Sequence, residues 1–230
     1  PFIDEAIEEI EYVIGDKNTV GGAKRIRDGH PKPFPLTYVE IGNEDNFDRS
    51  GSYEGRYAAF HDRIKARFPQ LQLIATMPVK SRKPDLIDDH YYRTADAMAG
   101  DANHYDRTDR SGSKIFVGEW ASQDIDAPWI DAGNKGPTPS LNSALGDAAW
   151  MTGMERNSDH VVISAYAPLF VNVNKGARQW ASNLIGFDGL RVYGSPSYYA
   201  QVMFSQNHGD QTLDSTVEGL SPVYCSPSVD

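Results

Sequence analysis

The chain has 230 residues, 40% hydrophobic and 23% charged, a balance typical of a folded globular protein and not of a disordered one. Its net charge of −10, from 32 acidic and 22 basic residues, disfavours a nucleic-acid backbone as partner, and no apolar run is long enough to span a membrane. The single cysteine, Cys225, excludes an intramolecular disulfide and a thiolate metal cluster.

The first half of the chain predicts helices and strands in alternation. Residues 2–14 place apolar side chains at helical spacing, and Gly15 can end that helix. A polar loop rich in Gly, Lys and Arg is expected next, up to the prolines before position 36. The elements predicted after this loop are a strand at 38–41, a helix at 53–68, and strands at 71–76 and 86–92.

The second half continues the alternation. Residues 94–105 are weakly helical, and a long loop at 121–140 is of a length that is usually functional. The clear elements are a strand at 114–120, a helix at 140–156 and a strand at 161–166. A loop through 194, a short helix at 197–206 and a polar tail from 208 complete the prediction.

This order of elements favours an α/β fold with a parallel sheet, because strands joined by helical crossovers run in one direction. The strands recur about every 31 residues, as in a (β/α)8 TIM barrel of roughly 250 residues. Only five strands are visible, so we expect strands 4 to 8 of a barrel, that is, a fragment of a larger enzyme. Residues 1–207 would form this part, and 208–230 would be a tail that could begin a β-sandwich domain. A doubly wound sheet is the alternative, but no glycine-rich phosphate-binding motif follows any strand.

Two glutamates lie where predicted strands stop. Glu44 follows Val39–Asn43 and precedes a turn, and Glu119 follows another short apolar run. Carboxylates at the ends of barrel strands can face each other across the barrel mouth. Retaining glycoside hydrolysis uses two carboxyl groups about 5–5.5 Å apart, one as nucleophile and one as general acid/base.

The segments around these glutamates resemble a known family. Ile41–Glu44 together with Val117–Trp120 resembles glycoside hydrolase clan A, and within it family 51, the α-L-arabinofuranosidases. Further segments that carry the resemblance are Tyr12–Gly15, Gly29–Pro31, Asp89–Tyr92, Tyr105–Arg107, Tyr166–Asn172 and Gly194–Tyr199.

The resemblance implies roles for individual residues. Glu44 would be the general acid/base, Glu119 the nucleophile, and Asn43 a hydrogen-bond partner of the sugar 2-hydroxyl. Tyr92, or Tyr91 if the register shifts, would hold the carboxylate of the nucleophile. His90, Trp120 and Asn172 would line the same pocket, and Trp180 would form a subsite wall.

The resemblance also implies a substrate and partners. We expect a retaining hydrolase that releases terminal α-L-arabinofuranosyl groups from arabinan, arabinoxylan or arabino-oligosaccharides, with no cofactor. Nucleic acid and membrane are not expected partners. The oligomeric state stays open, and a secreted or periplasmic location is favoured over a cytoplasmic one.

Other functions remain possible on the sequence alone. A clan A endo-β-glucanase or xylanase would use the same two glutamates, and a non-catalytic carbohydrate-binding or inactive fragment would use neither. Asp88, Asp89 and His90 suggest a metal site only weakly, because no further ligands match them, and we expect none. A Ser-His-Asp hydrolase is disfavoured because the chain has no Gly-x-Ser-x-Gly motif.

Overall fold

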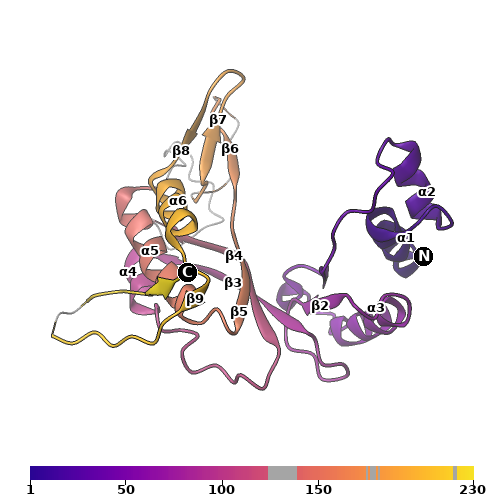
Figure 1. Cartoon of the computed structure of the whole chain (residues 1–230), viewed down its shortest axis with the longest axis horizontal. Coiled ribbons are helices and arrows are strands. Elements are labelled where there is room, and N and C mark those ends of the chain that lie inside the picture. The colour runs from indigo at the N-terminus through magenta and orange to yellow at the C-terminus, as the bar shows by residue number, and fades with distance from the viewer. Residues whose placement is uncertain (124–138, 175, 177–179, 181, 220–221) are drawn as a thin grey trace. The chain divides into compact units, whose positions relative to one another are not determined.

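The computed structural model describes residues 1–123, 139–174, 176, 180, 182–219 and 222–230. These residues form two compact units, Pro1–Asp88 (unit 1) and Asp89–Asp230 (unit 2). Each unit has a hydrophobic core of its own. Figure 1 labels the elements of both.

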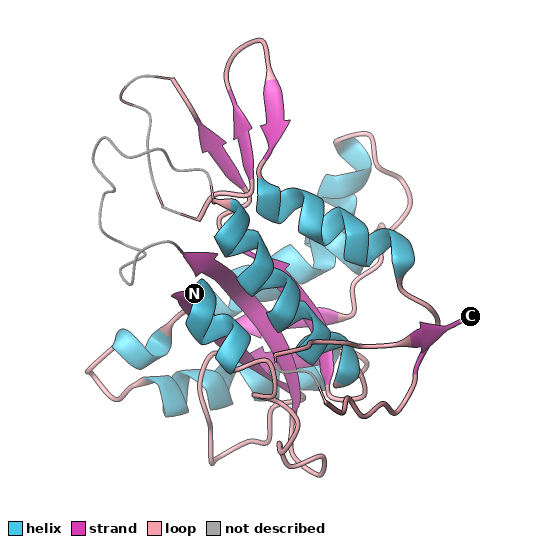
Figure 2. Cartoon of the chain, turned by 90° about the vertical axis from the view of Figure 1, so that its left-hand side faces the viewer, coloured by secondary structure: helices cyan, strands magenta, loops and turns pink. Residues whose placement is uncertain are grey.

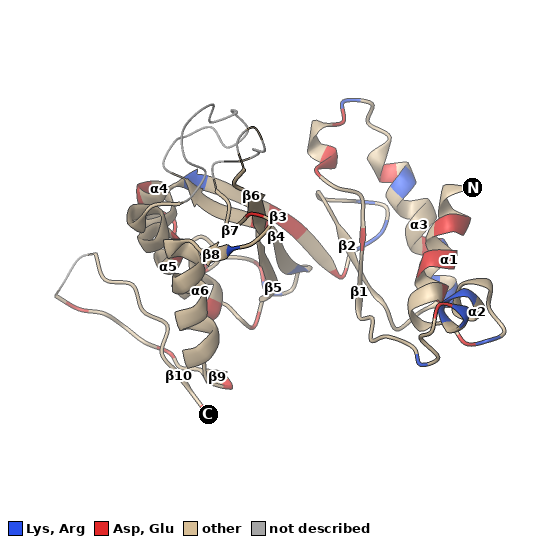
Figure 3. Cartoon of the chain, turned by 90° about the horizontal axis from the view of Figure 1, so that it is seen from above, with Lys and Arg blue, Asp and Glu red and all other residues tan. Residues whose placement is uncertain are grey.

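Three helices build much of unit 1. The predicted helices are confirmed as α1 (Phe2–Ile14) and α3 (Tyr53–Arg67), and Gly15 ends α1 as expected. The predicted loop after Gly15 is wrong, because it contains α2 (Val20–Arg27). Figure 3 shows acidic positions along α1 and basic ones on α2, and α1 packs against both α2 and α3.

Contacts with α1 explain how a glycine-containing segment forms α2. Thr19 caps the helix by accepting a hydrogen bond from the backbone N–H of Gly22, at 3.1 Å. The guanidinium of Arg25 is fully buried and donates to the carbonyl oxygens of Tyr12 and Gly15, both at 2.8 Å. These buried bonds satisfy carbonyl groups at the end of α1 and fix α2 against it.

The strands of unit 1 are parallel. β1 (Tyr38–Ile41) pairs with β2 (Gln72–Ala75), and β2 pairs with the start of β3 (Leu86–Thr94), a strand that begins in unit 1 and ends in unit 2. A short 3-10 helix, η1 (Asp45–Phe47), follows β1. The core between the strands and helices consists of Ile7, Ile10, Ile41, Tyr53, Tyr57, Ile64, Leu71, Leu73 and Ala75.

Unit 2 contains the second pair of parallel strands, β4 (Lys114–Gln123) and β5 (Val161–Tyr166). Helix α5 (Leu141–Arg156) starts after Ser140, whose hydroxyl caps it, and it packs against β4, α4 (Ala95–Gly100) and α6 (Pro196–Asn207). Figure 2 shows these helices beside the strands. The core includes Tyr91, Met98, Tyr105, Val117, Trp120, Trp150, Met151, Met154, Val161, Tyr166 and Leu184.

The segment after β5 is more ordered than the sequence suggests. The predicted loop through 194 is wrong, since it holds a small mixed sheet, and two further strands pair antiparallel in the tail. These strands are β6 (Phe170–Asn172), β7 (Ile185–Phe187), β8 (Val192–Gly194), β9 (Gln211–Thr212) and β10 (Ser228–Val229).

The expected alternation of helices with parallel strands is therefore confirmed. Of the predicted long loop at 121–140, residues 121–123 belong to β4, and residues 124–138 lie outside the described residues. Within the described part of the chain, no helix has both the length and the apolar character needed to cross a bilayer.

Candidate active site

Glu44 lies in the turn directly after β1, as the sequence predicts. Strand β1 ends at Ile41, and Gly42 then takes a backbone φ of 107°. A Cβ atom at Gly42 would lie 2.0 Å from Oδ2 of Asp45, so only glycine fits this turn. Glu44 itself has a φ of 50° and a ψ of 37°, in the left-handed region that L-residues rarely adopt. Asn43 and Glu44 thus occupy a sharply bent strand end in unit 1.

Sequence reasoning missed the residue that follows. The Asp45 side chain is buried, with 7% of its surface exposed, and its carboxylate accepts hydrogen bonds from three groups, those of Asn43, Arg56 and Thr76. In the sequence, Asp45 looks like one of several turn-forming acids. Its partners Arg56 and Thr76 are 11 and 31 residues away, so no local pattern indicates its burial.

The sequence predicts Glu119 at the end of its strand. The structure shows that this is wrong, because Glu119 lies inside β4. The pairing of β4 with β5 is irregular around it: Val117 pairs with Ser164 and Trp120 with Tyr166, so two residues of β4 lie between these pairs and one of β5. Such a bulge rotates a side chain relative to the regular pleat. The bulge therefore sets the direction of the Glu119 side chain.

Two side chains of β3 contact the Glu119 carboxylate within unit 2. The Tyr92 hydroxyl donates a hydrogen bond of 2.7 Å to Oε2, and Nδ1 of His90 lies 3.4 Å from the same oxygen. Residues 90 and 92 share one face of the strand because side chains alternate along it. The side chain of Glu119 is 36% exposed, so this held carboxylate is partly open to solvent.

Tyr91 points to the other side of β3. Its hydroxyl donates to Asp101, and its ring stacks on Trp150 with ring centroids 4.1 Å apart. Burial and the adjacent Asp101 raise the pKa of the Tyr91 phenol above its ordinary value. The alternative in which Tyr91 holds the Glu119 carboxylate is therefore wrong.

The remaining predicted site residues have different surroundings. Trp120 is 2% exposed and packs edge-on against Tyr166, which places its ring in the core of unit 2 and not at an exposed rim. Asn172 ends β6, where its side-chain oxygen accepts hydrogen bonds from the backbone and side chain of Asn174. Trp180 is 38% exposed, and its carbonyl oxygen accepts a hydrogen bond from Asn183.

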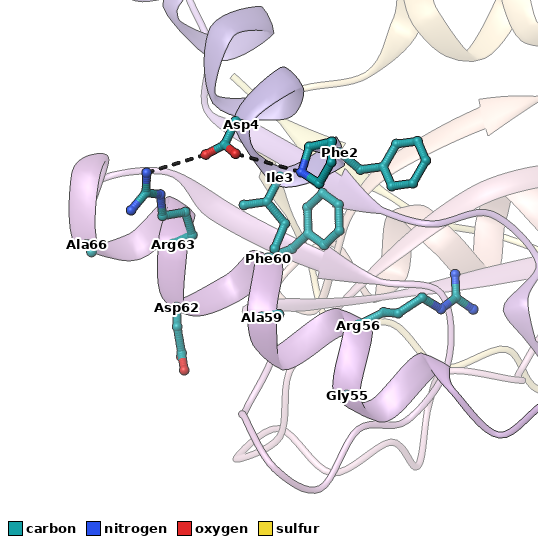
Figure 4. Close-up of a pocket in the computed structure, with 11 residues that line it drawn as sticks. Phe2, Ile3, Asp4, Gly55, Arg56, Ala59, Phe60, Asp62, Arg63 and Ala66 are labelled. Carbon is teal, nitrogen blue, oxygen red and sulfur yellow. Dashed lines mark hydrogen bonds and ion pairs between the residues drawn. The ribbon is translucent and has the colours of Figure 1, made fainter.

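An open groove also lies between the start of α1 and α3, and none of the predicted site residues lines it. Figure 4 shows Phe2, Ile3 and Phe60 along it, with Asp4 3.5 Å from the guanidinium of Arg63. Its lining is mostly apolar and contains neither glutamate of interest. The chemistry-bearing groups are thus the turn of residues 42–45 in unit 1 and the trio of His90, Tyr92 and Glu119 in unit 2.

Glycoside hydrolases act through a pair of carboxyl groups, and parallel α/β folds present such groups from their strands, so this class of enzyme is the one to compare. Two family models match the chain: the α-L-arabinofuranosidase 1 domain over residues 1–110 and the α-L-arabinofuranosidase C-terminal domain over residues 118–228. The chain belongs to the α-L-arabinofuranosidases of glycoside hydrolase family 51.

Curated relatives have the same family name. α-L-Arabinofuranosidase 2 of Arabidopsis thaliana is 40% identical over 224 residues, an alignment that covers 95% of this chain and 31% of the relative. α-L-Arabinofuranosidase A of Aspergillus kawachii is 38% identical over 234 residues, covering 97% of this chain and 35% of the relative. The chain thus spans about a third of the length of these relatives.

Solved structures agree with the fold. The arabinose-bound MgGH51 α-L-arabinofuranosidase superimposes with a TM-score of 0.85 at 40% identity, covering 94% of this chain and 35% of that one. An α-L-arabinofuranosidase of Thermotoga maritima in an arabinose complex gives a TM-score of 0.70 at 19% identity, over 92% of this chain and 48% of that one. At 19% identity this second likeness concerns the fold alone.

Proposed function

We propose that the protein containing this chain is a retaining exo-glycosidase that removes terminal α-L-arabinofuranosyl groups. The substrates would be arabinan, arabinoxylan or arabino-oligosaccharides. The observation that carries the proposal is the Glu119 carboxylate, which a bulge aims and the Tyr92 hydroxyl holds at 2.7 Å. The names of the relatives support arabinose as the sugar, and MgGH51 was solved with arabinose bound.

We assign the architecture accordingly. Residues 1–207 would supply strands 4 to 8 of a catalytic (β/α)8 barrel. Residues 208–230 would begin the next domain, and the separate pairing of β9 with β10 after the end of α6 supports this division.

The proposed reaction has two displacements. In the first, a Glu119 oxygen forms a bond to C1 of the arabinofuranosyl group while the bond from C1 to the leaving oxygen breaks, and the Glu44 carboxyl gives its proton to that oxygen. In the second, Glu44 takes a proton from water, the water oxygen bonds to C1, and the ester to Glu119 breaks. Arabinose leaves with its configuration retained, and both glutamates return to their starting states.

Neighbouring residues would support each step. The Tyr92 hydroxyl would orient the Glu119 oxygen and lose its hydrogen bond as that oxygen becomes an ester. His90 would line the same side of the pocket. Asn43, next to Glu44, would donate to the sugar 2-hydroxyl, a contact that strengthens as charge develops on the ring.

The test is the substitution Glu119→Ala in the full-length enzyme. We expect kcat on an aryl α-L-arabinofuranoside to fall by a factor of about 10³ or more, because the covalent route is removed. Added azide should restore release of the aryl group and give an arabinosyl azide of inverted configuration. The exposed Glu9→Ala on α1 serves as the matched control and should keep wild-type turnover.

Two results would contradict the proposal. Full turnover by Glu119→Ala without azide would exclude Glu119 as nucleophile. Faster hydrolysis of a β-linked glucan or xylan than of the arabinofuranoside by the wild-type enzyme would instead favour an endo-acting clan A enzyme.

A further inference from the structure

The turn that contains Glu44 is held by a buried network. Oδ2 of Asp45 accepts hydrogen bonds from the backbone N–H of Asn43, at 3.1 Å, and from the Thr76 hydroxyl, at 3.0 Å. Oδ1 accepts one of 2.8 Å from Arg56, which pairs with Asp45 as a cation. A buried carboxylate that accepts three hydrogen bonds is held in one orientation by its donors. The Asp45 side chain therefore acts as a fixed anchor beside Glu44.

A second buried group holds the base of the same turn. The Tyr53 hydroxyl donates to the carbonyl oxygen of Ile41, at 2.7 Å, and accepts from the backbone N–H of Thr76, at 2.9 Å. Burial raises the pKa of the Tyr53 phenol, so this hydroxyl keeps its proton and its donor function. The ends of β1 and β2 are thus tied together through one side chain. Thr76 belongs to both parts of the network, through its backbone and its hydroxyl.

The backbone between these two anchors is strained. The left-handed conformation of Glu44 is unfavourable for an L-residue, and such a conformation persists only where the surroundings over-determine it. Asp45 follows Glu44 directly, and its Oδ2 also binds the N–H of Asn43, the residue before Glu44. The carboxylate therefore bridges the residues on both sides of Glu44. Loss of that bridge would let Glu44 relax to an ordinary conformation and turn its side chain elsewhere.

We propose that Asp45, together with Thr76 and Arg56, is the positioning group for Glu44. The inference rests on the proposed function, in which Glu44 delivers the proton to the leaving group. The three residues would act through the backbone of the turn and without touching the sugar. A displacement of about 1 Å can lower a rate by roughly a hundredfold, so proton delivery is expected to be sensitive to this network.

The test uses Thr76→Val in the full-length enzyme, which removes the donor to Asp45 and keeps the side-chain shape. A misplaced acid hinders departure of a poor leaving group and matters little for a good one. We therefore expect kcat/KM to fall by about tenfold for methyl α-L-arabinofuranoside, and by less than about twofold for the 2,4-dinitrophenyl arabinofuranoside. Thr76→Ser retains the hydroxyl and should restore the activity on the methyl glycoside.

A matched control is Thr152→Val in α5. Thr152 and Thr76 are equally buried, each 8% exposed, but the Thr152 hydroxyl donates to the carbonyl oxygen of Ala149, within its own helix. Its replacement removes a buried threonine hydroxyl whose hydrogen bond lies within α5, in unit 2. Both substrates should then keep the same ratio of kcat/KM as in the wild type. This control separates positioning from a general loss of stability.

The variant Glu44→Ala distinguishes failure of this inference from failure of the proposed function. A large loss of kcat/KM on the methyl glycoside with a small loss of kcat/KM on the dinitrophenyl glycoside supports Glu44 as the acid of the first displacement, and equal losses of kcat/KM exclude that role. The positioning role is overturned if Glu44→Ala gives this selective loss but Thr76→Val does not. In that case Thr76→Val would lower kcat/KM equally for the two glycosides or leave both values unchanged. Selective loss in both variants, restored by Thr76→Ser, supports it.

Discussion

Neighbouring tyrosines of β3 have opposite environments, and this allows a direct test at the scale of single residues. Tyr92→Phe removes the 2.7 Å hydrogen bond to Glu119 without changing the ring. The hydroxyl would orient the Glu119 oxygen, and a displacement of about 1 Å can lower a rate by roughly a hundredfold, so we expect kcat to fall by roughly ten- to a hundredfold. Because the Glu119 carboxylate is partly open to solvent, which can replace the lost hydrogen bond, we expect little change in melting temperature. Steady-state kinetics and thermal melting of the full-length enzyme measure both quantities.

Tyr91→Phe is the matched variant. It removes the hydrogen bond from the buried Tyr91 side chain to the Asp101 carboxylate but keeps the stacking on Trp150, so we expect a destabilisation of about 1.5–3 kcal/mol and wild-type kcat. The opposite result, with kcat lowered by Tyr91→Phe and unchanged by Tyr92→Phe, would contradict the described register of β3.

At this scale the sequence predicts the position of Glu44 correctly but not that of Glu119, which lies inside β4 and not at its end. Glu44 is predicted at a strand end because apolar alternation stops before a turn, and this position is confirmed. The register of two consecutive tyrosines was open, because either could face the carboxylate. Asp45 was missed because its burial depends on Arg56 and Thr76, which only the fold brings to it.

Among the elements, α2 allows a test of whether close contact with α1 explains the glycines in a helix. A Cβ atom at Gly21 would lie 2.3 Å from the carbonyl oxygen of Glu8 in α1. Gly21→Ala therefore forces the two helices apart, and we expect a destabilisation of about 1–3 kcal/mol in thermal or urea unfolding. Gly55→Ala in α3 is the control, since its Cβ meets open space, and there alanine should stabilise by up to about 1 kcal/mol. Equal effects of the two substitutions would contradict the close contact of α1 and α2.

The helices whose limits are nearly as expected are long ones. Helices α1 and α3 have an apolar face over 13 and 15 residues, and α5 buries ten of its 16 residues. Helix α2 was missed because two adjacent glycines normally disfavour helix, and only contact with α1 makes them suitable. Strands β6 to β8 were missed because three residues are too few to give a period.

At the scale of the whole molecule, the buried His160 predicts a dependence of stability on pH. Burial and the nearby Arg110 and Lys114 lower the pKa of His160 in the folded state below its ordinary value of about 6.5. The unfolded chain therefore binds the proton more readily. The contribution of neutral His160 to stability is fully present above pH 6.5 and is lost as the pH falls from there towards the folded-state pKa.

We accordingly expect the melting temperature to fall more steeply below about pH 6.5 in the wild type than in His160→Gln. Melting curves between pH 5 and 8 measure the two slopes. His208→Gln is the control, since that residue is exposed, and it should keep the wild-type slope. Identical slopes for all three proteins would show that His160 is not the responsible group.

The alternation of helices and strands along the chain predicts parallel strands, which the structure confirms. The segments around the two glutamates predict the family, and the comparisons with known proteins agree. The division at Asp88 could not be predicted, because β3 runs through it without a break in its pattern. Which side chains share a core depends on contacts distant in sequence, and periodicity does not contain that information.

The left-handed backbone of Glu44 has a consequence for any redesign of this protein. Glycine or asparagine adopts φ and ψ values of 50° and 37° more readily than glutamate, so either would be chosen if stability alone were optimised. Substitutions ranked by folding free energy would thus remove the proposed proton donor among the first. Position 44 should therefore keep its glutamate in any redesign, although glycine or asparagine there would make the fold more stable.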